Sequence, residues 1–201
     1  VAPTGFMLGT GTRVVASEKI QAQGNMISTE NALDMAVEGQ GHFQILQQDG
    51  TLAYTRDGGF KLSEEGELVT AGGLLLQPAI IIPQEANSIS VGRDGTVSVE
   101  LANGGGSQQL GQIQLARFVN TSGLEALGAN LFRETAASGA PILLNPTEQG
   151  AGAIAQGMLE ASNVNVVEEL VTMIETQRAY EVNSKAISAV DSMLRFLNNN
   201  L

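Results

Sequence analysis

The sequence contains no cysteine and no tryptophan, and only 4% of its 201 residues are aromatic. Without cysteine, neither a disulfide bond nor a thiolate metal site can form. Few aromatic side chains are available to stack on the bases of single-stranded nucleic acids. A single histidine, His42, leaves no second imidazole for a metal site, so we expect His42 to be structural.

Positive charge is also scarce, because ten Lys and Arg residues stand against 21 Asp and Glu residues, for a net charge of −11. Nucleic acids and anionic membranes attract clustered Lys and Arg, so neither is an expected partner. No run of 18 apolar residues and no secretory signal is visible. Without a dinucleotide, P-loop or nucleophile-elbow motif, we expect no cofactor, no small-molecule substrate and no enzymatic activity.

Short apolar runs separated by Gly-containing turns occupy most of the chain. Strands are expected at residues 42 to 46, 52 to 55, 60 to 62, 68 to 70, 74 to 77, 79 to 82, 89 to 91, 96 to 99 and 113 to 118. Pairs such as Asp49-Gly50 supply the positive φ that tight hairpins need. This spacing predicts a mainly β fold, an antiparallel sandwich or an irregular barrel.

The β-like region is predicted to cover residues 1 to 161, with an extended or hairpin leading segment at about residues 1 to 35. Within residues 113 to 118, Ile113 and Leu115 alternate with Gln114, Ala116 and Phe118, so one face of this strand is expected to be more buried. Two Arg-Asp-Gly triplets, at residues 56 to 58 and 93 to 95, precede predicted strands. We interpret them as one turn chemistry used twice rather than as a structural duplication.

Residues 162 to 201 have the features of a single long helix. Asn165 is a favourable N-cap, and Glu168 follows it by three residues, as in a capping box. No Gly or Pro occurs after Asn165, so at about 1.5 Å per residue the helix would extend roughly 50 Å. A small β domain cannot cover a helix of that length.

Apolar residues run along this helix in two stripes. One recurs every seven residues, as in the seam of a coiled coil, and comprises Val166, Met173, Tyr180, Ile187, Leu194 and Leu201, with Val190 and Leu197 beside it. The other lies in the first half and comprises Val167, Leu170, Val171 and Ile174. We predict that both stripes form an assembly interface with coiled-coil contacts, in which Tyr180 either packs or hydrogen-bonds across the contact. A terminal helix packed on its own domain is the simpler alternative.

Two stretches resemble a known family. EASNVNVVEELVTMIETQRAYEVNSK, residues 160 to 185, closely resembles the C-terminal signature of the axial proteins that form the rod and hook of the bacterial flagellum. Gly39-Gln40-Gly41-His42-Phe43, followed by residues 53 to 58 and 68 to 70, is similar to the β-domain signature of that family. The resemblance runs from about residue 9 to the end. Residues 82 to 83, 92 to 95 and 130 to 141 are most similar to distal rod members.

The resemblance implies a structural subunit that polymerises helically with copies of itself into the rod, the drive shaft that carries torque from motor to hook. It further implies that the C-terminal helix pairs with an N-terminal helix in an inner tube, inside an outer layer of β domains. We expect that N-terminal helix to precede Val1. Implied partners are proximal rod proteins, the hook protein and the surrounding P- and L-ring proteins. The implied location is the periplasm-spanning rod of the basal body, reached through the flagellar type III apparatus without signal cleavage.

Two other classes of function stay open on the residues alone. A secreted β-rich adhesin or binding module with a helical anchor would need an exposed ligand patch on the β part. A hydrolase of β architecture would need paired acids in a cleft. Glu64, Glu65 and Glu67 cluster, but they flank a turn at Gly66, where a solvated tip is expected. Because an unpartnered helix is only marginally stable in water, we also expect the helix to order on assembly.

Overall fold

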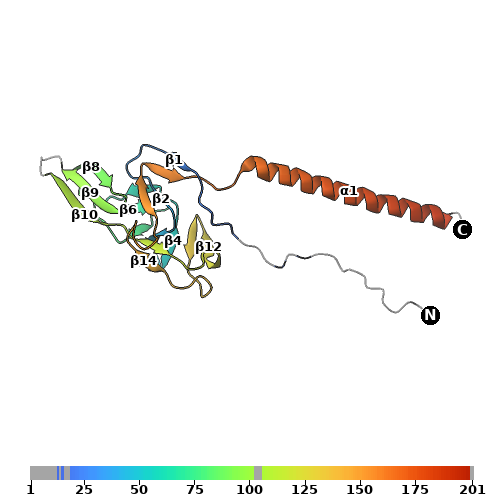
Figure 1. Cartoon of the computed structure of the whole chain (residues 1–201), viewed down its shortest axis with the longest axis horizontal. Helices are drawn as coiled ribbons and strands as arrows, with labels where there is room; N and C mark the ends of the chain where they lie inside the picture. The colour runs from blue at the N-terminus through green and yellow to red at the C-terminus, as the bar shows by residue number, and fades with distance from the viewer. Residues whose placement is uncertain (1–12, 14, 16–18, 102–105, 200–201) are drawn as a thin grey trace. The chain divides into compact units, whose positions relative to one another are not determined.

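The computed structural model describes residues 13, 15, 19–101 and 106–199, which form a mainly β unit and one long helix (Figure 1). The chain divides into two compact units, Val1–Ala161 and Ser162–Leu201. The strands are β1 Met26–Ser28, β2 Met35–Glu38, β3 His42–Leu46, β4 Leu52–Thr55, β5 Phe60–Leu62, β6 Leu68–Thr70, β7 Leu75–Gln77, β8 Ala86–Val91, β9 Thr96–Leu101, β10 Ser107–Gln112, β11 Leu115–Arg117, β12 Glu125–Gly128, β13 Leu131–Arg133, β14 Ile142–Leu144, β15 Ala153–Gln156 and β16 Met158–Glu160. A 3-10 helix, η1, covers Thr121–Gly123, and helix α1 covers Val166–Asn199. The predicted mainly β class with one C-terminal helix is confirmed.

The strand pairs among the described residues are all antiparallel. The largest sheet has the order β12-β13-β4-β3-β7-β6-β5, and β11 joins it by pairing with both β3 and β14. Strands β8, β9 and β10 form a separate three-stranded meander, while β1 pairs with β16 and β2 pairs with β15. None of the described sheets closes on itself, so this part of the chain is not a closed barrel.

Apolar side chains cover both faces of the large sheet. Phe43 lies opposite Leu115 and His42 lies opposite Ala116, and residues directly opposite one another share a face. Phe43 and Leu115 belong to the main core, which also includes Met35, Val37, Ile45, Phe60, Leu76, Val97 and Ile154. The face that carries His42 holds a second cluster of Tyr54, Ala116, Phe118 and Leu124, with Phe132 packed against it. Each large apolar side chain buried in this way contributes about 1.5–3 kcal/mol, so the β unit has a core of its own.

The strand predicted at residues 79 to 82 is wrong. Ile81 makes one isolated bridge to Glu67, and no continuous strand forms. Pro78 and Pro83 bracket the segment, and neither can donate a backbone hydrogen bond to a ladder. Ile80 and Ile82 are nevertheless buried in the main core, so the apolar run marks packing and not strand pairing.

The predicted one-sided burial of residues 113 to 118 is also wrong. Ala116 and Phe118 are buried, as are Ile113 and Leu115. The second cluster covers the face that the alternation assigned to a less buried environment. A strand with both faces covered shows no polar–apolar alternation to read.

Candidate assembly surface and polar junction

Helix α1 begins at Val166, and Asn165 caps it. The Asn165 side chain Oδ1 accepts a hydrogen bond from the Val167 amide at 3.2 Å, and its carbonyl accepts one from the Glu169 amide at 3.0 Å. Glu168 and Glu169 place two carboxylates in the first turn, where the helix dipole favours negative charge. The reciprocal contact from the Glu168 side chain, as a capping box would have it, stays a prediction.

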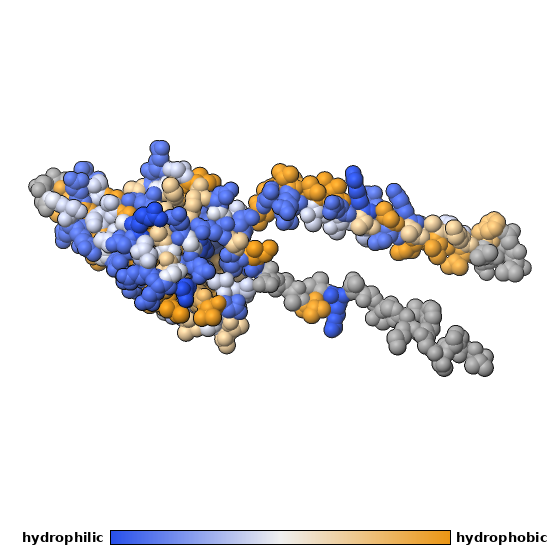
Figure 2. Space-filling view, in the orientation of Figure 1, coloured by the Kyte–Doolittle hydropathy of each residue, from blue (hydrophilic) through white to orange (hydrophobic). Residues whose placement is uncertain are grey.

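The predicted assembly residues of α1 are exposed in the single chain. Their exposed fractions lie between 48% for Ile174 and 75% for Tyr180. The set comprises Val166, Val167, Leu170, Val171, Met173, Ile174, Tyr180, Ile187, Val190 and Leu194. The side chain of Leu197, and Leu201, lie outside the described part of the structure. Figure 2 shows hydrophobic side chains along the helix, and an exposed apolar surface of this extent is typical of a protein–protein contact.

Three further apolar residues of α1, Val182, Met193 and Phe196, are 65–68% exposed and were missed by the sequence prediction. Together with Ala186 and Ala189 they recur at spacings of four and three residues, a second heptad seam. At 100° per residue this seam lies roughly 120° around the helix from Ile187, Val190 and Leu194. The second half of α1 therefore presents two apolar faces, and a search for heptads in every register would have found both.

Four hydroxyl side chains of α1 are satisfied within the helix. The hydroxyls of Thr172, Thr176, Ser188 and Ser192 each donate to the carbonyl four residues earlier, at 2.8–3.1 Å. A hydroxyl that already donates within the helix loses no donor bond when a neighbouring surface excludes water. In the first half of α1, Thr172 and Thr176 can therefore be covered by another chain at little polar cost.

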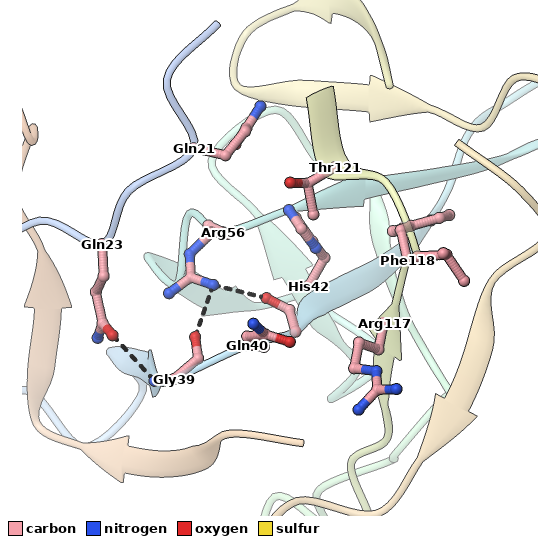
Figure 3. A pocket seen from close by; sticks show the side chains of 11 residues that line it. Gln21, Gln23, Gly39, Gln40, His42, Arg56, Arg117, Phe118 and Thr121 are labelled. Atoms are coloured by element: carbon pink, nitrogen blue, oxygen red, sulfur yellow. Dashed lines mark hydrogen bonds between the residues drawn. The ribbon is translucent and has the colours of Figure 1, made fainter. Parts of the chain in front are cut away.

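Within the β unit, Arg56 is the centre of a polar junction. Its Nε donates to Glu160 Oε2 at 2.9 Å, and its Nη2 donates to the Val37 carbonyl at 3.0 Å. Its Nη1 donates to the carbonyls of Gly39 and Gly41, both at 3.0 Å (Figure 3). Only 21% of the Arg56 side chain and 11% of the Glu160 side chain are exposed. One arginine thus joins the loop between β2 and β3 to strand β16.

The segment that leads into β1 is tied to the same junction. Glu160 Oε1 accepts a hydrogen bond from the Gly24 amide at 2.8 Å. The Gln23 side chain donates to the Val37 carbonyl and accepts from the Gly39 amide, both at 3.1 Å. Four segments distant in sequence therefore meet around one ion pair.

Strands β1 and β16 form a two-stranded antiparallel sheet, here called the terminal ribbon. Met26 lies opposite Glu160, and the Ala161 amide donates to the Asn25 carbonyl at 2.8 Å. Because the strands are antiparallel, the chain before β1 and the chain after β16 leave the ribbon at the same end. Arg56 and Glu160 hold that end.

The two Arg-Asp-Gly triplets share an aspartate contact, but they share neither the backbone turn, which is found only at residues 92–95, nor the role of the arginine. Asp57 Oδ1 accepts from the Gly59 amide and Asp94 Oδ1 accepts from the Thr96 amide, each at 3.1 Å. Arg93 pairs with Glu38 at 2.7 Å, but those side chains are 73% and 58% exposed. The Arg93 pair is therefore a surface contact, whereas the Arg56 pair is largely buried.

A polar pocket of about 350 Å³ lies beside the junction (Figure 3). Its described lining includes Gln21, Gln40, His42, Arg117, Phe118 and Thr121, and none of the described lining residues is a carboxylate. Glu64 and Glu65 are exposed in the turn between β5 and β6. The paired acids that a hydrolase would need are therefore not found in this pocket or at that turn.

His42 is buried on the sheet face that carries the second cluster. Its ring makes edge contacts with Phe118 and Phe132, with centroids 5.8 and 6.3 Å away. Burial, and secondarily the charge of Arg56, lowers the pKa of His42 from 6.5 to about 4, while the Ala116 backbone acts to raise the pKa. No described atom forms a hydrogen bond of good geometry with either ring nitrogen. His42 is therefore neutral at pH 7.

The described residues contain no cluster of three or more His, Asp or Glu side chains placed to hold a metal ion. The helix in this part of the chain is not apolar enough over a sufficient length to cross a lipid bilayer.

Known proteins match both the β unit and helix α1. Residues 36–99, which include Arg56, match the flagellar hook protein FlgE/F/G D1 domain, and residues 155–200, which include Glu160, match the flagellar basal body rod FlgEFG protein C-terminal domain. The flagellar basal-body rod protein FlgG of Buchnera aphidicola subsp. Acyrthosiphon pisum is 51% identical over 97% of this chain and 75% of its own length. The chain belongs to the FlgE/F/G family of flagellar proteins. The family resemblance found in the sequence is thereby confirmed.

Within the FlgE/F/G family, the chain is most like FlgG. In Caulobacter vibrioides, FlgG is 47% identical over 97% of this chain and 74% of its own length. FlgF of the same organism is 36% identical over 96% of this chain and 74% of its own length. The chain is a structural subunit of the flagellar rod in the basal body, and the adhesin alternative finds no support.

Proposed function

We propose that this FlgG-like chain polymerises helically with copies of itself into the distal rod, which carries torque from motor to hook. In this proposal residues 162–201 form the inner tube and residues 1–161 the outer layer. Its neighbours are proximal rod proteins, the hook protein and the P- and L-ring proteins. It reaches the periplasm through the flagellar type III apparatus without signal cleavage.

The exposed apolar surface of α1 is the observation that carries this proposal. A helix that packs against one partner needs one apolar stripe, whereas α1 presents apolar residues on more than one face along its length. An open heterologous interface repeated by a screw operation builds a filament in which each subunit touches several neighbours. Full burial of each large apolar side chain contributes about 1.5–3 kcal/mol, which is the driving force for assembly.

The β unit supports a structural and non-catalytic role. His42 is buried and neutral, so it is poorly suited to exchange protons with a substrate at neutral pH. The unit has a core of its own, so it does not need α1 to fold. These properties fit an outer layer attached to an assembling helix.

Electron microscopy of the full-length chain, with a growing rod end supplied, tests the proposal. Deletion of residues 166–201 is expected to abolish tube formation. Ile187→Glu and Met193→Glu each place a charge in one of the two seams, and each is expected to prevent assembly. Ser188→Glu adds the same charge on the polar face and is expected to leave assembly intact.

One control and two refuting outcomes complete the test. Circular dichroism of the free variants checks that the β unit is folded, so that a loss of tubes is not a loss of folding. If both seam variants assemble like the unmodified chain, α1 is not the interface. If the unmodified chain stays monomeric at high concentration beside a rod end, the polymer proposal fails.

A further inference from the structure

The terminal ribbon is too small to hold its own position. Strands β1 and β16 have three residues each. An isolated two-stranded sheet is marginal in water even when it is longer. Its place on the β unit comes from contacts outside the ribbon. Beside β15, which pairs with β2, the Gly157 amide donates to the Asp34 carbonyl at 2.8 Å. At the other end of the ribbon, Arg56 and Glu160 make the contacts.

Separating the terminal ribbon from the β unit would break several polar contacts of the Arg56–Glu160 pair at once. Both Glu160 oxygens are in use, one by Arg56 and the other by the Gly24 amide. The Arg56 guanidinium also satisfies one carbonyl of β2 and two carbonyls of the loop between β2 and β3. Displacing β16 would separate a largely buried ion pair and leave each charge without its partner.

We propose that Arg56 and Glu160 are positioning residues that lock the terminal ribbon onto the β unit, so that load on α1 reaches the β unit through this pair. The mechanical part rests on the proposed function, in which neighbouring subunits hold α1. Only residues 162–165 separate Ala161 from the first residue of α1, Val166. A short connection of this kind passes force directly to the strand that precedes it.

The chain contains a matched comparison for this pair. Arg93 is likewise followed by Asp-Gly in the sequence and likewise pairs with a glutamate, Glu38. That pair is mostly exposed, and exposed pairs contribute little because water and salt screen them. Arg93→Lys is therefore the control for Arg56→Lys, since the chemistry of the substitution is the same and only the surroundings differ.

Amide hydrogen exchange of the free full-length chain, followed by NMR, tests the lock. Arg56→Lys keeps the charge but loses the planar fork, and Glu160→Gln keeps an acceptor for Gly24 but loses the charge. In both variants the amides of Gly24 and Ala161 are expected to exchange at least about tenfold faster, while core amides such as that of Ile45 change less than about twofold. Arg93→Lys is expected to change neither set. Unchanged ribbon amides, or equal acceleration of ribbon and core, would overturn the lock.

Cells that carry the same variants test the mechanical part. Because both helix seams are intact, Arg56→Lys and Glu160→Gln subunits are expected to enter rods. Those rods are expected to drive motility less well than unmodified rods as medium viscosity increases, and Arg93→Lys rods are not. Equal motility at every viscosity would overturn the role in load transfer. If the unmodified chain does not enter rods, the proposed function fails and the load transfer with it, whereas the exchange result still decides whether the lock exists.

Discussion

Replacing His42 with phenylalanine is expected to remove a large part of the acid sensitivity of the β unit. The His42 ring packs edge-on against Phe118 and Phe132, and no described atom forms a hydrogen bond of good geometry with its nitrogens. Phenylalanine can occupy a similar place among these rings and cannot bind a proton. The variant therefore isolates the effect of protonating one buried imidazole.

The magnitude follows from the pKa of His42, which is lowered from 6.5 to about 4 in the folded chain. The unfolded chain therefore takes up the proton at higher pH than the folded chain does. The free energy of unfolding is unaffected by His42 above pH 6.5 and falls as the pH decreases toward 4. At 1.36 kcal/mol per pKa unit the loss is about 3 kcal/mol, a large share of the usual 5–15 kcal/mol stability of a domain.

Urea denaturation between pH 7 and pH 4 is the assay, with near-UV circular dichroism of buried Tyr54 as the signal. The His42→Phe variant and the chain that keeps His42 would both carry Tyr180→Phe, which removes the tyrosine of α1 from the signal. The larger phenyl ring that the His42→Phe substitution introduces adds a packing cost of roughly 1–3 kcal/mol that does not depend on pH. The informative quantity is therefore how the difference in unfolding free energy between the His42→Phe variant and the chain that keeps His42 changes with pH.

The His42→Phe variant is expected to gain about 3 kcal/mol relative to the unmodified chain as the pH falls from 6.5 to 4. Phe60→Leu, in the main core, is the control, and its destabilisation is expected to be the same at every pH. If the difference in stability between the His42→Phe variant and the chain that keeps His42 stays constant across the range, the argument is refuted.

Two further predictions concern Gly58 and α1. A Cβ on Gly58 would overlap the Met35 carbonyl oxygen, so Gly58→Ala is expected to cost about 3 kcal/mol or more in urea denaturation. Gly72→Ala meets no atom closer than 3.9 Å and is expected to cost less than about 1 kcal/mol; equal costs would contradict the contact. In dilute free chain, α1 is expected to melt gradually and below the melting temperature of the β unit, because helical order without packing is weakly cooperative. A single transition shared by the far-UV and near-UV signals would show that α1 is stabilised by the β unit.

Strand prediction from the sequence succeeded where the pairing is local. The bounds of β3, β4, β5 and β6 agree with the structure, because Asp-Gly and Glu-Gly turns set hairpins between neighbours in the sequence. Strands β1 and β16 were not predicted, because each is three residues long and pairs with a partner more than a hundred residues away. Strand β10 has few apolar residues and forms by pairing with β9.

The sequence by itself determined the family, the β class, the long helix and the first of its apolar seams. These features depend on motifs and on periodicities of two, 3.6 or seven residues, which act between near neighbours in the chain. Only the tertiary structure decided that His42 is buried and that Arg56 differs from Arg93. Arg56 and Glu160 are 104 residues apart in the sequence. The burial of a charge and the identity of its partner depend on segments that folding brings together from far along the chain, and no local pattern records them.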